Sequence, residues 1–202
     1  MFTGLVEATG TIAGLTPTAS GYRLAIRTAL AAQLQPGESV AVNGVCLTVT
    51  GTGEGEWHAD VGPETARVTT LGTLAQDAVV NLERSMRADS RFGGHMVQGH
   101  VDGVGLVEQV RGDGESHWIA VSCEAALLPL LVRKGAVTVD GVSLTVAALE
   151  GTRFEVMVIP FTWTHTNLSA RRAGDRVNIE CDVVGKYVAR AVELFGQQTG
   201  SR

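Results

Sequence analysis

An internal repeat constrains the fold of this chain more than any other feature of its sequence. Residues 40–49 read VAVNGVCLTV, and residues 137–146, 97 positions later, read VTVDGVSLTV. The same spacing aligns residues 80–83 (VNLE) with residues 177–180 (VNIE). Matches of this density in the same order indicate two copies of one structural unit.

The first residues of the chain recur as well, at a spacing of 95. Residues 1–10 align with residues 96–105 through methionine, glycine and valine positions, so the boundary between copies falls near Gly93-Gly94. We therefore predict a first domain over residues 1–92 and a second over residues 93–183. A C-terminal helix and tail are expected over residues 184–202.

Each copy contains a dipeptide that favours a two-residue β-hairpin, Asn43-Gly44 in the first and Asp140-Gly141 in the second. Both central residues of a type I′ turn need positive φ, which Asn, Asp and Gly tolerate. The turn fixes the register, with Ala41 opposite Cys46. The valines and leucines of each hairpin then point into a core, and the alternating small or polar residues form the other face.

Further alternating segments predict about six short strands per copy. They lie near residues 4–13, 21–27, 55–61 and 79–83, with equivalents near 98–107, 117–122, 153–159 and 176–180. Short helices are expected near 28–34, 64–71, 124–132 and 161–168. The predicted fold is all-β with short helices, as two tandem six-stranded antiparallel β-barrels plus a C-terminal helix.

The expected C-terminal helix is amphipathic over about residues 184–195. Its apolar stripe consists of Val184, Val188, Ala191, Val192 and Phe195. The pattern alone leaves two interpretations open. The stripe packs either against another subunit or against the helix's own barrel.

Composition excludes several classes of protein. The formal net charge is −5 with no long run of one sign, which argues against nucleic-acid binding. No stretch approaches about 18 unbroken apolar residues, so no membrane span is expected. The N-terminus lacks signal-peptide features. Three cysteines without CxxC spacing fit the reducing cytoplasm better than a disulfide framework or a structural zinc site.

Several residues are candidates for chemistry. Cys46 lies on the polar hairpin face, and its counterpart is Ser143. A position that takes a thiol in one copy and a hydroxyl in the other is less typical of a core, although a small buried side chain remains the alternative. His95 and His100 are five residues apart, which suits neither a helix nor one strand face, so one histidine in proton transfer is more plausible than a metal pair.

Two charged residues have open interpretations. Lys134, before Gly135, could bind an anion, form a Schiff base or stay solvated. Asp182 follows a strand and could orient a hydroxyl or simply end the strand. Asp140 is expected to shape its turn as Asn43 does.

No GxGxxG, P-loop, HExxH or GxSxG motif occurs, so nucleotide hydrolysis, zinc proteolysis and α/β-hydrolase chemistry lack support.

Four ordered blocks resemble the riboflavin synthase family, the trimeric, lumazine-consuming kind, over nearly the whole chain. They are MFTGLVE at residues 1–7, VNGVCLTVT at 42–50, GGHMVQGHVDG at 93–103, and Lys134-Gly135 with DGVSLTV at 140–146. A segment that departs from the family is Pro160-Phe161-Thr162-Trp163, where members often carry smaller or charged residues and leucine. That departure leaves the details of the second pocket open.

The resemblance implies a two-barrel homotrimer in which a C-terminal helix assembles the subunits. It implies dismutation of two 6,7-dimethyl-8-ribityllumazine molecules by four-carbon transfer, giving riboflavin and 5-amino-6-ribitylaminouracil. It implies no metal or redox cofactor and a site between the N-terminal barrel of one subunit and the C-terminal barrel of its neighbour. An association with lumazine synthase is left open.

The resemblance also implies the residues of each lumazine-binding barrel. Catalytic roles would fall to His100, Cys46, Ser143, Asp182 and Lys134. His100 would transfer a proton, Cys46 and Ser143 would support the nucleophile or departing group, and Asp182 would orient Ser143 or a water. Substrate would contact Phe2, Thr3, Ser39, Thr48, Gly62 and Thr65 in the first pocket. In the second pocket it would contact Asp140, Thr145, Ile159 and Thr162.

Two other interpretations compete with the enzyme. A non-catalytic lumazine- or flavin-binding protein could use the same scaffold, but such proteins tend to lose residues of the catalytic face, which this chain retains. A flavin-reductase-like barrel would need a nicotinamide-binding domain, and two copies already fill the 202 residues.

Overall fold

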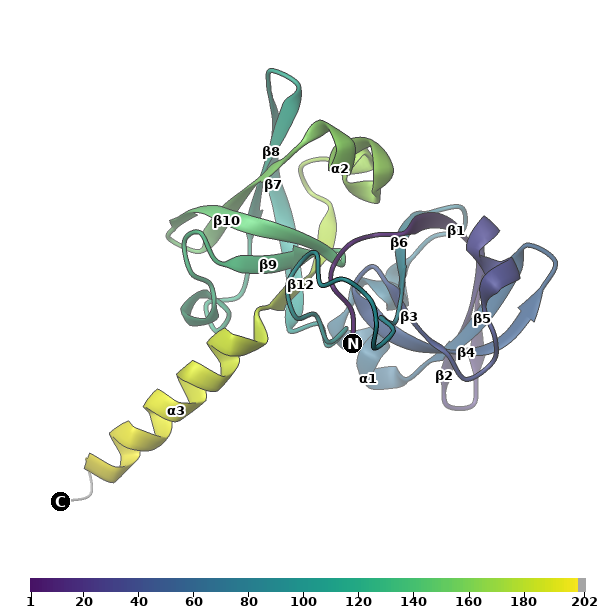
Figure 1. Ribbon diagram of the computed structural model, residues 1–202, viewed down its shortest axis with the longest axis horizontal. Coiled ribbons are helices and arrows are strands. Elements are labelled where there is room, and N and C mark those ends of the chain that lie inside the picture. The colour runs from purple at the N-terminus through teal and green to yellow at the C-terminus, as the bar shows by residue number, and fades with distance from the viewer. Residues whose placement is uncertain (200–202) are drawn as a thin grey trace.

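The computed structural model describes residues 1–199 and contains two closed six-stranded barrels that lie side by side (Figure 1). The first barrel is built from β1 (Ala8–Thr18), β2 (Gly21–Arg27), β3 (Ser39–Val42), β4 (Val45–Gly53), β5 (Glu56–Val61) and β6 (Val79–Arg84). The second is built from β7 (Gly103–Asp113), β8 (Ser116–Ser122), β9 (Ala136–Val139), β10 (Val142–Glu150), β11 (Arg153–Val158) and β12 (Arg176–Cys181). The predicted fold of two tandem antiparallel barrels is confirmed.

The hairpins have the predicted turns and register. Asn43 and Asp140 have φ values of 45° and 47°, and the glycine that follows each also has positive φ. Ala41 pairs with Cys46 in the first hairpin, and Thr138 pairs with Ser143 in the second. The valines and leucines of both hairpins lie in the barrel cores. The opposite face therefore carries Cys46 and Ser143 at equivalent positions.

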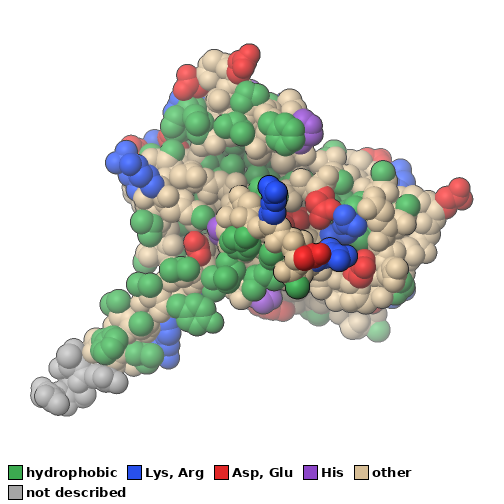
Figure 2. Space-filling model, in the orientation of Figure 1, with side chains coloured by type: hydrophobic (Ala, Val, Ile, Leu, Met, Phe, Trp, Pro, Cys, Tyr) green, Lys and Arg blue, Asp and Glu red, His purple; other side chains and the backbone are tan. Residues whose placement is uncertain are grey.

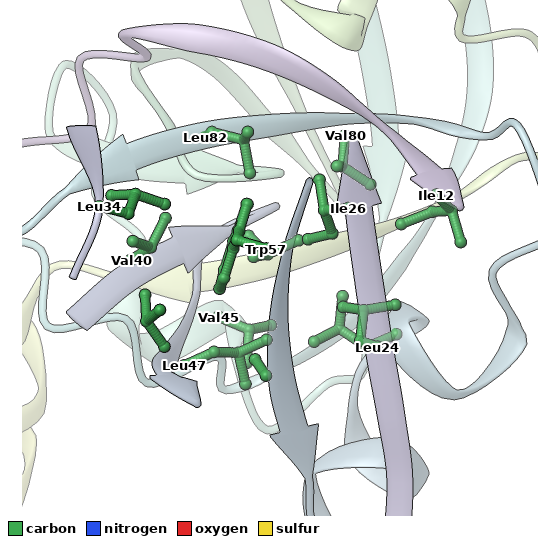
Figure 3. Packing of buried hydrophobic residues seen from close by; sticks show 14 of the residues in the cluster. Ile12, Leu24, Ile26, Leu34, Val40, Val45, Leu47, Trp57, Val80 and Leu82 are labelled. Carbon is green, nitrogen blue, oxygen red and sulfur yellow. The ribbon is translucent and has the colours of Figure 1, made fainter. Parts of the chain in front are cut away.

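Each barrel packs around one large aromatic side chain. Trp57 on β5 is fully buried in the first barrel, among residues such as Val40 and Leu47 (Figure 3). Its equivalent, Phe154 on β11, is fully buried in the second. Burying a side chain of this size contributes roughly 1.5–3 kcal/mol relative to leaving it in water. Both cores are complete within one chain, so each barrel surface is available for other contacts.

Helical segments lie close to most predicted positions. They are η1 (Ala29–Gln33), α1 (Pro63–Val68), η2 (Thr70–Thr73), η3 (Leu128–Leu130), α2 (Pro160–His165), η4 (Asn167–Ala170) and α3 (Val183–Thr199). The expected helix near 124–132 is limited to the single turn of η3. The expected helices near 64–71 and 161–168 each consist of an α-helix followed by a 3₁₀ helix. They divide at Thr69 and Thr166, whose hydroxyls accept the backbone N–H two residues ahead and begin the 3₁₀ turn.

The C-terminal helix α3 includes the predicted residues 184–195 and projects away from the second barrel (Figure 1). Of the predicted tail, residues 200–202 lie outside the described part of the chain. Across residues 1–199, no helix combines the length and apolar character needed to cross a membrane.

The first strand of each copy begins later than predicted. The sequence predicted strands near 4–13 and 98–107, but β1 begins at Ala8 and β7 at Gly103. The preceding residues instead cross to the other barrel. Gly4 and Gly99 have left-handed φ values of 76° and 79°, which turn the chain out of the strand direction. The N-terminus consequently lies between the two barrels in Figure 1.

The two copies meet through reciprocal contacts. Phe2 and Val97, equivalent residues of the two crossing segments, exchange backbone hydrogen bonds with N···O distances of 2.7 and 3.2 Å. The hairpin turns lie back to back, since a Cβ added at Gly44 would fall 2.8 Å from the backbone nitrogen of Gly141. Contacts that repeat with the partners exchanged indicate approximate two-fold symmetry within the chain.

Candidate functional site

The hairpin face of the second barrel borders a cavity of about 580 Å³. This volume is in the range of pockets that hold small organic ligands. Its walls come from the segment before β7, from strands β8 to β11 and from α2. The lining residues are Gly93, Gly94, His95, Trp118, Ala136, Ser143, Leu144, Thr145, Ala147, Met157, Ile159 and Thr162. Four predicted site residues, Ser143, Thr145, Ile159 and Thr162, are therefore brought together in one cavity.

Ser143 is held in this cavity by contacts with both crossing segments. Its backbone N–H donates to the carbonyl oxygen of Gly4 at 2.8 Å. Its Oγ lies 2.7 Å from Nδ1 of His95. A serine hydroxyl hydrogen-bonded to an imidazole can pass its proton to the ring as it attacks, or take the proton back. The arrangement is suited to proton transfer at a ligand bound beside Ser143.

His95 is half-buried, and its environment favours the neutral ring. Burial lowers the pKa of His95 from its ordinary 6.5, while the negative charge of Asp182 acts in the opposite direction. Nε2 of His95 is buried and has no hydrogen-bond partner among the described residues. Nδ1 of a neutral imidazole can accept the Ser143 hydroxyl proton, which makes His95 a base near neutral pH.

The predicted site residues do not include His95, because the proton-transfer role was predicted for His100, yet the His95 ring is the one hydrogen-bonded to Ser143. His100 lies with its side chain exposed, and its backbone N–H donates to Glu180. The signal that points to His95 is the preceding Gly93-Gly94 pair. A Cβ at Gly94 would lie 2.0 Å from the carbonyl oxygen of Thr3, so only glycine allows the crossing segments to approach.

The equivalent face of the first barrel centres on Cys46, which is half-buried and packs against Phe2, Ala41 and Val97. The Cys46 N–H donates to the carbonyl oxygen of Gly99 at 2.9 Å, as Ser143 donates to Gly4. The backbones of Cys46 and Ser143 are thus held by equivalent hydrogen bonds. The thiol differs from Ser143 because no histidine side chain is hydrogen-bonded to it among the described contacts.

Polar groups of the first barrel border a separate cavity of about 370 Å³ that includes Thr3 and Ser39. Ser39 pairs in register with the exposed Thr48. Gly62 immediately precedes α1 and Thr65 lies within it. They are equivalent in sequence position to Ile159 and Thr162 of the second cavity.

The two faces differ in polarity. In the first barrel Arg23 and Asp60 form an exposed ion pair with an N···O distance of 2.8 Å. The second barrel carries Trp118 and Met157 at the equivalent positions, and both line its cavity. The second face is therefore more apolar, although the Arg111 guanidinium lies over the Trp118 ring, 4.6 Å from its centroid.

The aromatic residues of α2 have structural partners. The Trp163 ring stacks on His117 with centroids 3.8 Å apart, and Phe161 stacks on His165 at 4.1 Å. Trp163 is partly buried and packs against the second core, while Phe161 is exposed. The departure from the family pattern thus leaves Thr162 free to line the cavity.

Two predicted ligand contacts are fully buried in the single chain. Phe2 lies between the copies, where it packs against Ala41, Val97 and Cys46. Asp140 is also fully buried, and its carboxylate accepts the N–H of Asn178 and pairs with Arg171. Asp140 shapes its turn, as predicted, but lies at the contact between barrels and outside the cavity.

The two remaining predicted residues lie at the margin of the second barrel. Lys134 is exposed on the turn before β9, with a left-handed φ of 67°. Asp182 is half-buried between β12 and α3, where its Oδ1 accepts the N–H of Val184 at 3.0 Å. Asp182 therefore begins the helix and also contributes negative charge near His95.

Comparison with known proteins gives consistent matches. The lumazine binding domain family matches twice, over residues 3–85 and 98–182. The riboflavin synthase of Bacillus amyloliquefaciens is 42% identical over 94% of this chain and 89% of its own length. The riboflavin synthase of Mycobacterium tuberculosis (strain ATCC 25618 / H37Rv) is 44% identical over 97% of this chain and 100% of its own.

Solved structures share the fold at lower sequence identity. LumP complexed with riboflavin superposes with a TM-score of 0.84 at 22% identity, covering 90% of this chain and 99% of its own. LumP complexed with 6,7-dimethyl-8-(1'-D-ribityl) lumazine gives a TM-score of 0.82 at 21% identity, with the same coverage. These similarities support the two-barrel fold.

Proposed function

This chain belongs to the riboflavin synthase family, and we propose that it catalyses the dismutation of two 6,7-dimethyl-8-ribityllumazine molecules. One molecule gives up a four-carbon unit and the other receives it. The products are riboflavin and 5-amino-6-ribitylaminouracil, which together contain all the atoms of the two substrates. The chain is an enzyme of the transferase class.

The observation that carries this function is the equivalent placement of Cys46 and Ser143. Each lies at the same position of its hairpin, and each N–H donates to the carbonyl oxygen of a left-handed glycine from the other copy. Two such faces suit two identical substrates. Holding both substrates in one geometry converts a bimolecular encounter into an effectively unimolecular step.

The residues can be assigned roles on this basis. A methyl group of one lumazine must lose a proton, and the ring of the other must accept a nucleophile. We assign proton transfer at the second face to the Ser143–His95 pair, with Asp182 as the nearby charge. His100 and Cys46 are assigned the corresponding roles at the first face. Lys134 remains a prediction, since its side chain lies in solvent.

Substrate binding is assigned to the polar groups around these residues. Thr3, Ser39, Thr48, Gly62 and Thr65 would bind one ligand, and Thr145, Ile159 and Thr162 the other. Trp118 and Met157 give the second face an apolar surface for a heteroaromatic ring. Hydroxyl side chains provide partners for the ribityl hydroxyls.

We further propose a homotrimer in which the reacting faces come from neighbouring subunits. The predicted apolar stripe of α3 is exposed, which favours packing against another subunit over packing on its own barrel (Figure 2). Val188 and Val192 line a groove of about 620 Å³ beside Leu130 and Val132. A second α3 inserted there would cover this apolar surface.

A reducing, cytoplasmic location is part of the proposal. Its support is that Cys46, Cys123 and Cys181 are free thiols, with no disulfide between them.

A binding protein without catalysis is the second candidate, favoured by the fold it shares with ligand-bound LumP. The sequence identity of this chain to LumP is 22%, whereas its identity to the two riboflavin synthases named above is 42% and 44%. The Ser143–His95 hydrogen bond, which is suited to proton transfer, also supports the enzyme. The enzyme is therefore the better supported of the two.

Incubation with 6,7-dimethyl-8-ribityllumazine as the sole substrate separates the two candidates. We expect riboflavin fluorescence to appear with chelator present, and two substrate molecules to disappear per riboflavin formed. Binding of the lumazine without any change of its spectrum over hours would establish the binding protein. A requirement for a second, different substrate would contradict the dismutation.

A further inference from the structure

Two buried glutamates occupy equivalent positions at the contact between the barrels. Glu83 lies at the end of β6 and Glu180 near the end of β12, and they are 6% and 1% exposed. The carboxylate is a costly group to bury unless donors satisfy its oxygens. Both residues must therefore be held by specific partners.

Glu83 holds the first crossing segment. Its Oε1 accepts the backbone N–H of Thr3 at 2.7 Å and the Thr3 hydroxyl at 2.8 Å, and its Oε2 accepts the N–H of Gly4 at 2.9 Å. The carbonyl of Thr3 in turn accepts the N–H of His95 at 3.2 Å, and that of Gly4 accepts the N–H of Ser143. A carboxylate of the first barrel thus supports the reactive pair of the second.

Glu180 makes the reciprocal arrangement. Its Oε1 accepts the N–H of Gln98 at 2.7 Å, and its Oε2 accepts those of Gly99 and His100, each at 3.0 Å. The carbonyl oxygen of Gly99 accepts the N–H of Cys46. A carboxylate of the second barrel thus holds the backbone of His100 and, through Gly99, supports Cys46 of the first face.

We propose that Glu83 and Glu180 are positioning residues, each setting the geometry of the reacting groups on the opposite barrel. This inference rests on the proposed function for its catalytic consequence, but its structural content is independent. The two faces are built from shared parts, because each needs the sixth strand of the other copy. Hydrogen bonds from N–H groups to an ionised carboxylate are strong enough to fix such a segment.

Burial and the donors have opposite effects on these carboxyls. Burial is the largest influence on the pKa of both Glu83 and Glu180 and raises it, while the backbone N–H donors lower it. Replacement of either glutamate by glutamine keeps the size of the side chain. The replacement turns one acceptor oxygen into an NH₂ donor that faces backbone N–H groups, so some of the hydrogen bonds that hold the crossing segment are lost.

Amide hydrogen exchange measured by NMR on the folded full-length protein tests directly whether each glutamate positions groups on the opposite barrel. In Glu180→Gln we expect the Cys46 amide to exchange about tenfold faster while the Ser143 amide is unchanged within about twofold. In Glu83→Gln we expect the reverse. Glu150→Gln, at the exposed end of β10, is the control and should leave both amides unchanged. Equal acceleration of both amides in either variant, or none, would overturn the proposal.

Turnover of 6,7-dimethyl-8-ribityllumazine supplies the functional readout. Misplaced reacting groups should lower kcat about tenfold or more in both glutamine variants, with KM changed by less than about threefold. Wild-type kcat in a variant with the expected exchange pattern would refute the positioning role. Absence of turnover in the wild type would instead refute the proposed function and leave the exchange test intact. Glu83→Asp and Glu180→Asp, which keep the charge but shorten the reach, serve if a glutamine variant does not fold.

Discussion

Asp140 and Arg171 form an ion pair at the contact between the barrels, with Nε of Arg171 lying 3.0 Å from Oδ2 of Asp140. The equivalent residues of the first copy are Asn43 and Leu74. The carboxylate of Asp140 and the amide of Asn43 make the same contact to their own copy, to the N–H of Asn178 and Asn81 respectively. The ion pair is therefore a departure from symmetry in this contact.

This difference between the copies predicts that Asp140→Asn compensates for the loss of stability caused by Arg171→Leu. Arg171→Leu alone leaves the fully buried Asp140 carboxylate without its cation and should cost about 3–5 kcal/mol of unfolding free energy. Asp140→Asn should cost less, because Arg171 can turn toward solvent. The double variant reproduces the first copy and should recover to within about 1 kcal/mol of wild type. Urea unfolding of all four proteins checks this, and strictly additive losses would contradict it.

A second prediction concerns the Ser143–His95 pair. His95→Gln and Ser143→Ala should each lower kcat about 100-fold, since both remove the same proton transfer. The double variant should be no slower than the worse single variant, because the two residues act as a unit. His58→Gln, on β5 of the first barrel, is the control and should retain wild-type kcat. If steady-state kinetics showed that the kcat of the double variant falls by the product of the two single losses, the two residues would act independently and the prediction would be wrong.

The electrostatics of His95 predict a pH dependence of stability. Its folded pKa lies below 6.5, so the unfolded chain binds the proton at higher pH than the folded chain does. The contribution of His95 to stability is then fully present above 6.5 and is lost as the pH falls from 6.5 toward the folded pKa. We expect the difference in unfolding free energy between wild type and His95→Gln to shrink on acidification between about pH 7.5 and 5. A difference independent of pH would show that the ring titrates equally in both states.

The exposed apolar stripe of α3 predicts that this helix holds the subunits together. Val188→Asp should convert the proposed trimer into a smaller species and abolish most turnover, while the barrels keep their near-ultraviolet circular dichroism. Val188 is 58% exposed in the single chain, so the substitution should not disturb the fold of one subunit. Arg190→Ala, on the same helix, is the control. Sedimentation analysis that finds a monomeric wild type with full turnover would contradict the proposal.

Local signals in the sequence predicted much of the fold. The Asn43-Gly44 and Asp140-Gly141 turns fix their own register, because the turn type determines which residues pair. The repeat then extended this register to the equivalence of Cys46 and Ser143. These features depend on residues that are neighbours in the chain or repeated at a constant spacing, so a single sequence is sufficient for them.

Contacts between the copies were not predictable in the same way. The strand pattern continues through Gly4 and Gly99, but capture of these segments by Glu83 and Glu180 turns them out of their barrels. His95 and His100 belong to one irregular segment, and their separation does not reveal that the His95 ring is hydrogen-bonded to Ser143 of the second barrel. The burial of Asp140 likewise arises only when two turns from distant parts of the chain meet.

Mixing two impaired variants tests the central claim, that one turnover needs a first-barrel face and a second-barrel face from neighbouring subunits. His100→Gln impairs the first face and His95→Gln the second. Equal amounts should be unfolded, refolded together and assayed with 6,7-dimethyl-8-ribityllumazine. Random assembly leaves both faces intact at about a quarter of the sites, so turnover should return to about a quarter of wild type. Turnover no greater than the average of the two variants would contradict the claim, since each reacting pair would then lie within one chain.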